Sequence, residues 1–363
     1  MTERARGRWG LLLRLLPGLL ALALFTQILD LDLLRAALVQ PAARGWLALG
    51  VVAYAVSHLA GGLAWRGLVA TPGRPLPMTE VLRLDLGSGF WSTVLPGAVA
   101  GELIKGVRLA GRGHAPVRVA HGLLVGRLCS VGMASVLGGL GAWATPSLGS
   151  EVQAAAMSAF GGLLAAALGG LAVVNLGSRA LRHLPWLAGG GEVQAEPMDQ
   201  GAEGGPAPLR NASPGVWPAP PDGGTGRAAF VTRVRDATRR ALVALVAAPP
   251  PSPGRLARSA LAAGTMHALL GGMYVCVFKA AGATIPLPTG MALSSLSAIA
   301  ESLPISVGGY GVRELVVTAL ATPVVGAAPA AVGALALAVP VTTMLVAGGL
   351  VEALQSIRSR ASR

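Results

Sequence analysis

The chain has 363 residues, of which 53% are hydrophobic and 12% are charged, and its formal net charge is +13. A soluble domain carries about 25% charged residues, so this composition excludes an ordinary soluble protein and indicates one that crosses a membrane. The 2 cysteines, Cys129 and Cys276, lie far apart inside apolar segments. They lack the close spacing of metal ligands, and we expect no metal and no cofactor.

Several segments are long enough to cross a bilayer, which needs about 20 predominantly apolar residues. They are residues 11–29, 46–69, 118–143, 152–176, 258–281 and 330–353. Two further apolar segments, 79–110 and 288–326, are each interrupted by a Leu-Pro pair and glycines, which break helices. The sequence therefore predicts an all-α polytopic membrane protein with about six full spans and two broken hairpins.

Charge placement predicts how the chain lies in the membrane, because loops rich in Lys and Arg stay in the cytoplasm. The basic residues gather on one predicted side: Arg4, Arg6, Arg8, Arg66, Arg74, Arg83, Lys105, Arg108, Arg112, Arg118, Arg179, Arg182, those between 227 and 258, and the tail Arg358, Arg360 and Arg363. Both termini are therefore expected in the cytoplasm. This distribution explains the net charge without a nucleic-acid partner.

The same charge rule predicts that the two broken segments are re-entrant. Segment 79–110 has basic residues before and after it, so it should enter from the cytoplasm and turn back. Segment 288–326 should do so from the outer side. The order span, hairpin, span then occurs twice with opposite orientation, over 46–143 and 258–353, as in transporters built from inverted repeats. The alternative is that Gly and Pro only kink ordinary spanning helices.

A polar insertion divides the chain into membrane halves at 1–187 and 248–363. Residues 188–226 are rich in Gly, Pro and Ala and poor in large apolar residues, so we predict a disordered cytoplasmic linker. Residues 227–247 carry apolar residues at helical spacing with arginines between them. This pattern fits a basic amphipathic helix on the lipid surface, or an ordinary basic loop beside the membrane.

Charged residues beside the breaks are candidates for a binding site, because ionisable groups at membrane depth are costly and usually face a cavity, a partner or a substrate. Glu102 follows the first break, and Arg127 lies within the next span. Glu301, Arg313 and Glu314 flank the second break. A helix restarting after a break offers unpaired N–H groups, and an arginine can hold a phosphate through two hydrogen bonds. Arg313 and Arg127 are therefore predicted to bind an anion.

The glycines of the second break, Gly308, Gly309 and Gly311, would let backbone approach the substrate closely. A structural alternative remains open for the charged residues. Arg313 and Glu314 could pair with other buried charges, and Arg127 with Glu102 or Glu314. The three glutamates could carry protons or only compensate charge.

Lys105 and Arg108 also flank the first break. We expect these two residues to be interfacial anchors.

The motifs at these positions resemble those of a known family. They are Leu95-Pro96-Gly97 with Gly101-Glu102, Arg127-Leu128, and the run Leu303-Pro304-Ile305-Ser306-Val307-Gly308-Gly309-Tyr310-Gly311-Val312-Arg313-Glu314. They are similar to motifs of the lysylphosphatidylglycerol synthase transmembrane, or flippase-like, family, whose members commonly have a Gly-Gly pair where this chain has Ala100-Gly101. The resemblance covers the chain apart from 188–257. It implies a multi-pass protein of the bacterial inner membrane that moves a lipid between leaflets.

The expected function is translocation of a phosphate-bearing lipid whose headgroup binds between the two hairpins. Full-length synthases of the family carry a further aminoacyltransferase domain, so we do not expect lipid aminoacylation here. No GxxxxGK motif indicates ATP hydrolysis, and the chain is not expected to be an enzyme. One alternative is a membrane-embedded transferase acting on a lipid carrier, with Glu301 or Glu102 as base. Another is a scaffold that recruits lipid-synthesis enzymes through residues 227–247.

Overall fold

The computed structural model describes residues 40–70, 76–94, 100–183, 245, 248–301 and 311–361. Several predictions fall outside these residues. They concern the predicted span at 11–29, the predicted linker at 188–226, nearly all of the predicted helix at 227–247, and residues 95–99 and 302–310 of the two predicted breaks. Gly308 and Gly309 are among the last of these, so their predicted role also lies outside the described residues.

The described chain is helical throughout. Its elements are α3 (Pro41–Val69), α4 (Met78–Val94), α5 (Ala100–Gly111), α6 (Pro116–Trp143), a 3-10 turn η1 (Pro146–Leu148), α7 (Ser150–His183), α9 (Pro253–Ala280), α10 (Leu287–Glu301), α11 (Val312–Val325), α12 (Ala327–Ala336) and α13 (Ala338–Ala361). Proline occupies the start of α3, α6 and α9, where its fixed φ suits a helix and its missing N–H costs nothing.

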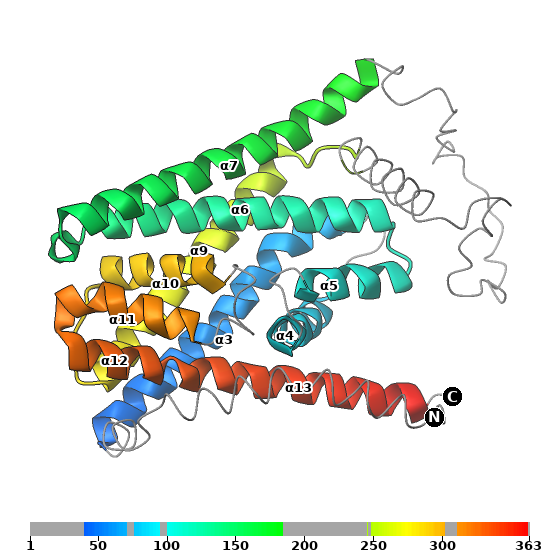
Figure 1. The fold of residues 1–363 in the computed structure, drawn as a ribbon. Coiled ribbons are helices and arrows are strands. Elements are labelled where there is room, and N and C mark those ends of the chain that lie inside the picture. The colour runs from blue at the N-terminus through cyan, green and yellow to red at the C-terminus, as the bar shows by residue number, and fades with distance from the viewer. Residues whose placement is uncertain are drawn as a thin grey trace, which may run out of the picture.

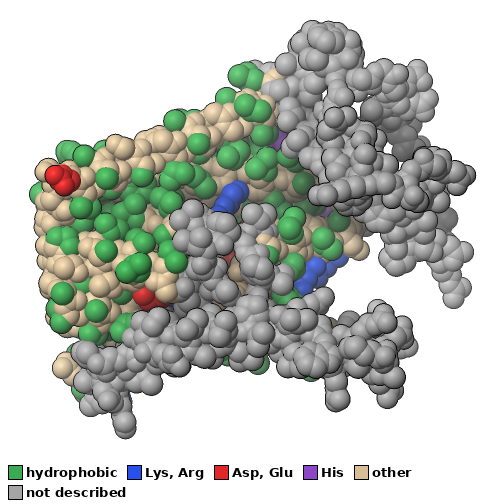
Figure 2. Space-filling view, viewed as in Figure 1, with side chains coloured by type: hydrophobic (Ala, Val, Ile, Leu, Met, Phe, Trp, Pro, Cys, Tyr) green, Lys and Arg blue, Asp and Glu red, His purple; other side chains and the backbone are tan. Residues whose placement is uncertain are grey.

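Within the described residues, 5 segments are long and apolar enough to cross a membrane. They are Pro41–Val69, Pro116–Trp143, Ser150–Leu176, Pro253–Ala280 and the combined α12–α13 segment Ala327–Ile357. All correspond to predicted spans, which confirms a multi-pass membrane protein. Figure 2 shows that apolar side chains dominate the described part of the visible face, where charged groups are isolated. A lipid environment explains this exposure, because lipid tails solvate such side chains.

The last predicted span, 330–353, consists of two consecutive helices rather than one. Helix α12 ends at Ala336, Leu337 keeps right-handed helical angles, and α13 begins at Ala338. Pro340 has no N–H to donate to the carbonyl of Ala336, and its ring crowds that carbonyl. The segment is therefore a candidate span whose helix is interrupted at Leu337.

Each predicted broken segment consists of two short helices. The first is α4 and α5, and the second is α10 and α11, with outer ends within one residue of the predicted 79–110 and 288–326. In Figure 1, α5 lies toward the end of the bundle where α6 begins and α13 ends. Helices α10 and α11 lie toward the opposite end, where α7 begins. Neither pair runs the full length of the bundle.

Helices α3 and α9 pack against each other at the centre of the bundle. The largest core cluster joins Leu47 of α3, Val277 and Phe278 of α9, Val317 of α11 and Ala334 of α12. This core connects the two halves of the chain. The site described next is built beside it.

Two glycine contacts hold the short helices to long ones. A Cβ at Gly348 of α13 would clash with the carbonyl oxygen of Leu86 in α4. A Cβ at Gly141 of α6 would clash with the carbonyl oxygen of Pro288 in α10. Both positions need glycine because a neighbouring backbone occupies the space of a side chain.

Candidate functional site

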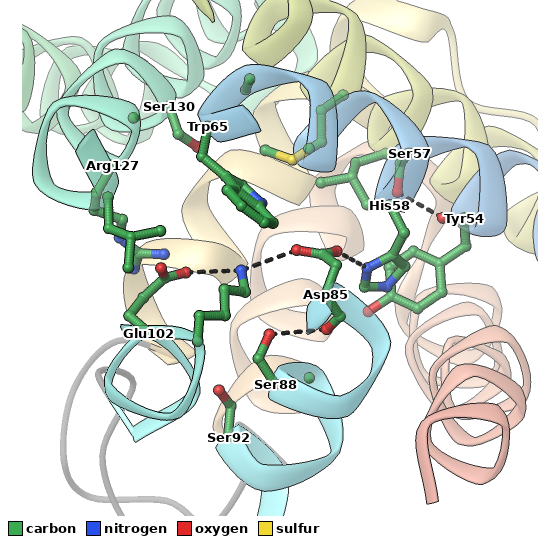
Figure 3. Close-up of a pocket in the computed structure, with 18 residues that line it drawn as sticks. Tyr54, Ser57, His58, Trp65, Asp85, Ser88, Ser92, Glu102, Arg127 and Ser130 are labelled. Atoms are coloured by element: carbon green, nitrogen blue, oxygen red, sulfur yellow. Dashed lines mark hydrogen bonds and ion pairs between the residues drawn. The ribbon is translucent and has the colours of Figure 1, made fainter. Parts of the chain in front are cut away.

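A polar cavity of about 280 Å³ lies among α3, α4, α5, α6 and α9 (Figure 3); we call it the central cavity. The polar side chains on its wall are Tyr54, Ser57, His58, Trp65, Asp85, Ser88, Ser92, Glu102, Lys105, Arg127 and Ser130. Burying so many polar groups inside an apolar bundle costs free energy unless they form hydrogen bonds or ion pairs with one another or with a ligand.

Lys105 forms ion pairs with both carboxylates that line the central cavity. Its Nζ donates to Asp85 Oδ1 at 2.9 Å and to Glu102 Oε1 at 3.1 Å. On the other side of Asp85, Oδ2 lies 2.8 Å from His58 Nδ1. Lys105 is 5% exposed and Asp85 9%. The contacts therefore form a chain from Glu102 through Lys105 and Asp85 to His58. Figure 3 labels Glu102, Asp85 and His58 along this chain.

The local sequence explains how α5 reaches this position. Glu102 and Lys105 are three residues apart, so both lie on one face of α5. Gly101 lies against the α4 backbone, and a Cβ there would sit 2.6 Å from the carbonyl oxygen of Ser88. This close approach brings the Lys105 ammonium within reach of Asp85 across the two helices.

Arg127 completes the set of charges from the α6 side. It is exposed, and among the residues that the structure describes it forms no salt bridge. Lys105, in contrast, is held by two carboxylates. Among the described residues, the guanidinium of Arg127 is thus a cation on the cavity wall that no carboxylate holds in a salt bridge.

An apolar groove of about 430 Å³ adjoins the central cavity between α5 and α6; we call it the α5–α6 groove. It shares Glu102, Leu123 and Arg127 with the wall of the cavity. Leu103 and Val107 on its α5 side are 64% and 72% exposed. A polar chamber and an apolar surface thus meet at one glutamate and one arginine.

A second charged cluster lies at the start of α11. Arg313 Nη2 donates to Glu314 Oε1 at 2.6 Å, and its Nη1 lies 3.7 Å from Glu301 Oε1 on α10. Glu314 Oε2 accepts a hydrogen bond of 2.7 Å from the Gly311 N–H, which closes the end of the helix. Gly311 has φ 84°, a conformation that favours glycine. Arg313 and Glu314 are both buried, at 4% and 7% exposure.

The sequence matches the family described as the lysylphosphatidylglycerol synthase TM region over residues 11–349. The chain belongs to this family. Its members are membrane domains associated with lipid modification or flipping. No curated protein matches the chain.

The sequence-predicted residues of this family member fall into two groups. Glu102 and Arg127 line the central cavity. Glu301, Gly311, Arg313 and Glu314 gather at the second cluster, which is not part of that wall. Arg313 faces two carboxylates there, so its positive charge is already compensated. This arrangement favours the structural alternative that the sequence left open for Arg313.

His58 and Asp85 line the central cavity but were not among the residues predicted from the sequence. A signal was present, because Asp85 is an acidic residue within the apolar segment before the first break. The expectation that Lys105 is an interfacial anchor is wrong, since its side chain is buried against Asp85. Spacing along α5 alone does not show that Lys105 points toward α4 and α3.

Arg108 pairs across the fold. Its Nη1 and Nη2 donate to the two carboxylate oxygens of Glu352 on α13, at 2.6 Å and 2.5 Å. Trp91 Nε1 donates to the same carboxylate at 3.0 Å. This two-pronged contact ties α4 and α5 to the last helix.

Proposed function

We propose that this protein moves a phosphate-bearing lipid between membrane leaflets. The observation that carries the proposal is the junction of the polar central cavity and the apolar α5–α6 groove at Glu102 and Arg127. A lipid has the same division into a charged head and an apolar tail. Membership of a family associated with lipid modification or flipping agrees with it.

The headgroup binds in the central cavity, with its phosphate on Arg127. A guanidinium offers two parallel N–H donors that match phosphate oxygens. The Lys105 ammonium, held by Asp85 and Glu102, supplies a fixed polar wall. These groups replace part of the hydration that a headgroup loses inside the bilayer, and this lost hydration is the main barrier to crossing. The acyl chains lie along the α5–α6 groove and in the surrounding lipid.

The two broken segments act as re-entrant hairpins of an inverted repeat. The helix contacts support this. The first helix of each hairpin packs on the span before it in its own half and on the span after the hairpin in the other half. Helix α4 packs on α3 and α13, whereas α10 packs on α9 and α6. The glycine contacts at Gly348 and Gly141 fit the same pattern. Sites of such transporters lie where discontinuous helices meet. We place both termini in the cytoplasm and the protein in the bacterial inner membrane.

Reconstitution into vesicles tests the proposal. A fluorescent phospholipid is placed in both leaflets, and an impermeant quencher reports how fast the inner pool reaches the outside. We expect wild-type protein to accelerate this exchange and Arg127→Gln to reduce it at least about tenfold, the effect of losing a charge-assisted contact. Arg258→Gln is the matched control, because Arg258 is exposed on α9 and its Nε donates to the Gly254 carbonyl. Equal rates for Arg127→Gln and wild type would sink the assignment.

A membrane-embedded transferase is the second candidate, favoured by the His58–Asp85 pair. Asp85 contacts Nδ1 of His58, while Nε2 is buried without a partner among the described residues. A histidine oriented by a carboxylate is a common general base. The two functions separate by product. A lipid of new mass after incubation with membrane extract indicates the transferase, and unchanged lipid in the opposite leaflet indicates translocation.

A further inference from the structure

A second cavity, about 340 Å³ in volume, lies where α6 and α9 begin; we call it the α6–α9 pocket. Leu68 of α3, Arg118 and His121 of α6, and Arg255 of α9 line it, together with the proline run at 249–251. It shares no wall residue with the central cavity, although both use α6. Residues 118, 121, 122 and 125 of α6 face the pocket, whereas 123, 126, 127 and 130 face the cavity.

The α6–α9 pocket carries positive charge without an acidic partner in the described residues. No carboxylate is on its wall, and neither Arg118 nor Arg255 forms a salt bridge within the described ranges. Two arginines held near each other repel, so this arrangement favours an anion between them.

The N-termini of α6 and α9 add to the positive electrostatic potential of the pocket. Both helices begin with proline, and neither N-cap residue, Ala115 or Ser252, makes a side-chain hydrogen bond to its helix. Arg118 and Arg255 lie in the first turns. The free N–H groups and the positive dipole end of each helix attract anions, most strongly phosphate.

His121 is the independent sign of a ligand. It lies on the pocket wall at 5% exposure, and its Nε2 is buried without a hydrogen-bond partner among the described residues. An unpaired buried polar group is costly, so its retention indicates a group that pairs with it. An imidazole N–H is a suitable donor to a phosphate oxygen.

We propose that the α6–α9 pocket binds a phosphate group, held by Arg118, Arg255 and His121. This site is additional to the proposed translocation site. The prolines at 249–251 on its wall have fixed φ, which limits how far this segment can rearrange when a ligand binds. The phosphate belongs to an anionic phospholipid or to a soluble phosphate compound, and both present the same oxygens.

Native mass spectrometry of the full chain in detergent tests the proposal. The probes are dioleoylphosphatidic acid, dioleoylglycerol, which lacks the phosphate, and inorganic phosphate. We expect wild-type protein to bind at least one phosphate-bearing probe. The double substitution Arg118→Gln with Arg255→Gln should weaken that binding at least about tenfold, and His121→Phe should weaken it less.

Controls separate this site from the rest of the molecule. Arg258→Gln removes an exposed arginine one turn along α9 that is not on the pocket wall, and should leave binding within about twofold. Arg127→Gln tests the central cavity, so a loss confined to that variant belongs to the proposed function and overturns this one.

Each outcome of this binding experiment either supports the proposed phosphate site or overturns it. Loss of phosphatidic acid binding alone identifies a lipid phosphate, and loss of inorganic phosphate binding identifies a soluble one. Unchanged binding in the double variant overturns the proposal, as does an equal loss in Arg258→Gln or an equal loss of dioleoylglycerol. If the double variant does not fold, His121→Phe carries the test by the same comparison.

Discussion

The two charged clusters that follow the breaks differ in what surrounds them. At the start of α11, Arg313 is held between Glu314 and Glu301, and Glu314 also closes its own helix through the Gly311 N–H. In the central cavity, Arg127 shares its wall with Glu102 and Lys105 but forms no salt bridge among the described residues. Similar residues beside similar breaks therefore have different surroundings. Arg313 is compensated by carboxylates at a helix start, and the position of Arg127 beside a cavity agrees with the ligand-binding role that we propose for it.

The largest expected effect comes from Arg313. Arg313→Met leaves two carboxylates without their cation, and breaking a buried pair in this way costs about 3–5 kcal/mol. We expect the free energy of unfolding, measured by denaturant titration in detergent, to fall by this amount. Arg313→Met combined with Glu314→Gln should recover part of it, because one uncompensated carboxylate is gone. A stable Arg313→Met protein that no longer moves lipid would assign the phosphate to Arg313 instead.

Lys105→Met tests the central cavity in the same way. Asp85 and Glu102 lose their shared cation, but the cavity admits water, so we expect a smaller loss of about 1–3 kcal/mol. Lipid exchange in vesicles should fall at least about tenfold, because the wall around Arg127 is disordered. Arg127→Gln is the companion variant and should lose exchange with an unchanged unfolding midpoint. Equal destabilisation by both substitutions would show that Arg127 is structural.

The inverted repeat that we propose predicts matched sensitivity at two glycines. Gly348→Ala pushes α13 away from α4, and Gly141→Ala pushes α6 away from α10. Overpacking of this kind costs about 1–3 kcal/mol, and we expect similar losses at both positions. Gly161→Ala on α7 is the control, because nothing lies within 4 Å of a Cβ there. Thermal unfolding in one detergent compares the three. Sensitivity at only one of the two contacts would argue against their equivalence.

Glu352→Gln should have the smallest effect. The amide oxygen still accepts one hydrogen bond from Arg108, but the two-pronged ionic contact is lost. We expect about 0.5–1.5 kcal/mol of destabilisation by denaturant titration. Arg108→Lys should resemble it, since lysine cannot make the paired contact. A much larger loss would mean that this contact determines how α4 and α5 pack on α13.

Much of the fold could be predicted because it depends on properties local to the sequence. Apolar runs of about 20 residues determine which segments can span a bilayer, whatever their partners. Proline and glycine determine where a helix must stop, and the ends of the broken segments follow within one residue. The sequence alone also determined family membership and the candidate status of Arg127 and Glu102. Pro340 is a sequence signal for the interruption at Leu337, which the predicted span 330–353 did not include.

The central cavity required the tertiary structure. His58 and Asp85 are 27 residues apart, and Asp85 and Lys105 are 20 apart, on three different helices. Arg108 and Glu352 meet across 244 residues. Helical periodicity specifies which face of a helix a residue occupies, but not which helix lies opposite. Close packing, such as that of Gly101 in α5 against the backbone of α4, decided that Lys105 meets a carboxylate inside the protein rather than lipid at its surface. For the same physical reason, only the structure showed that Arg313 is paired with carboxylates, whereas Arg127 lines a cavity and forms no salt bridge among the described residues.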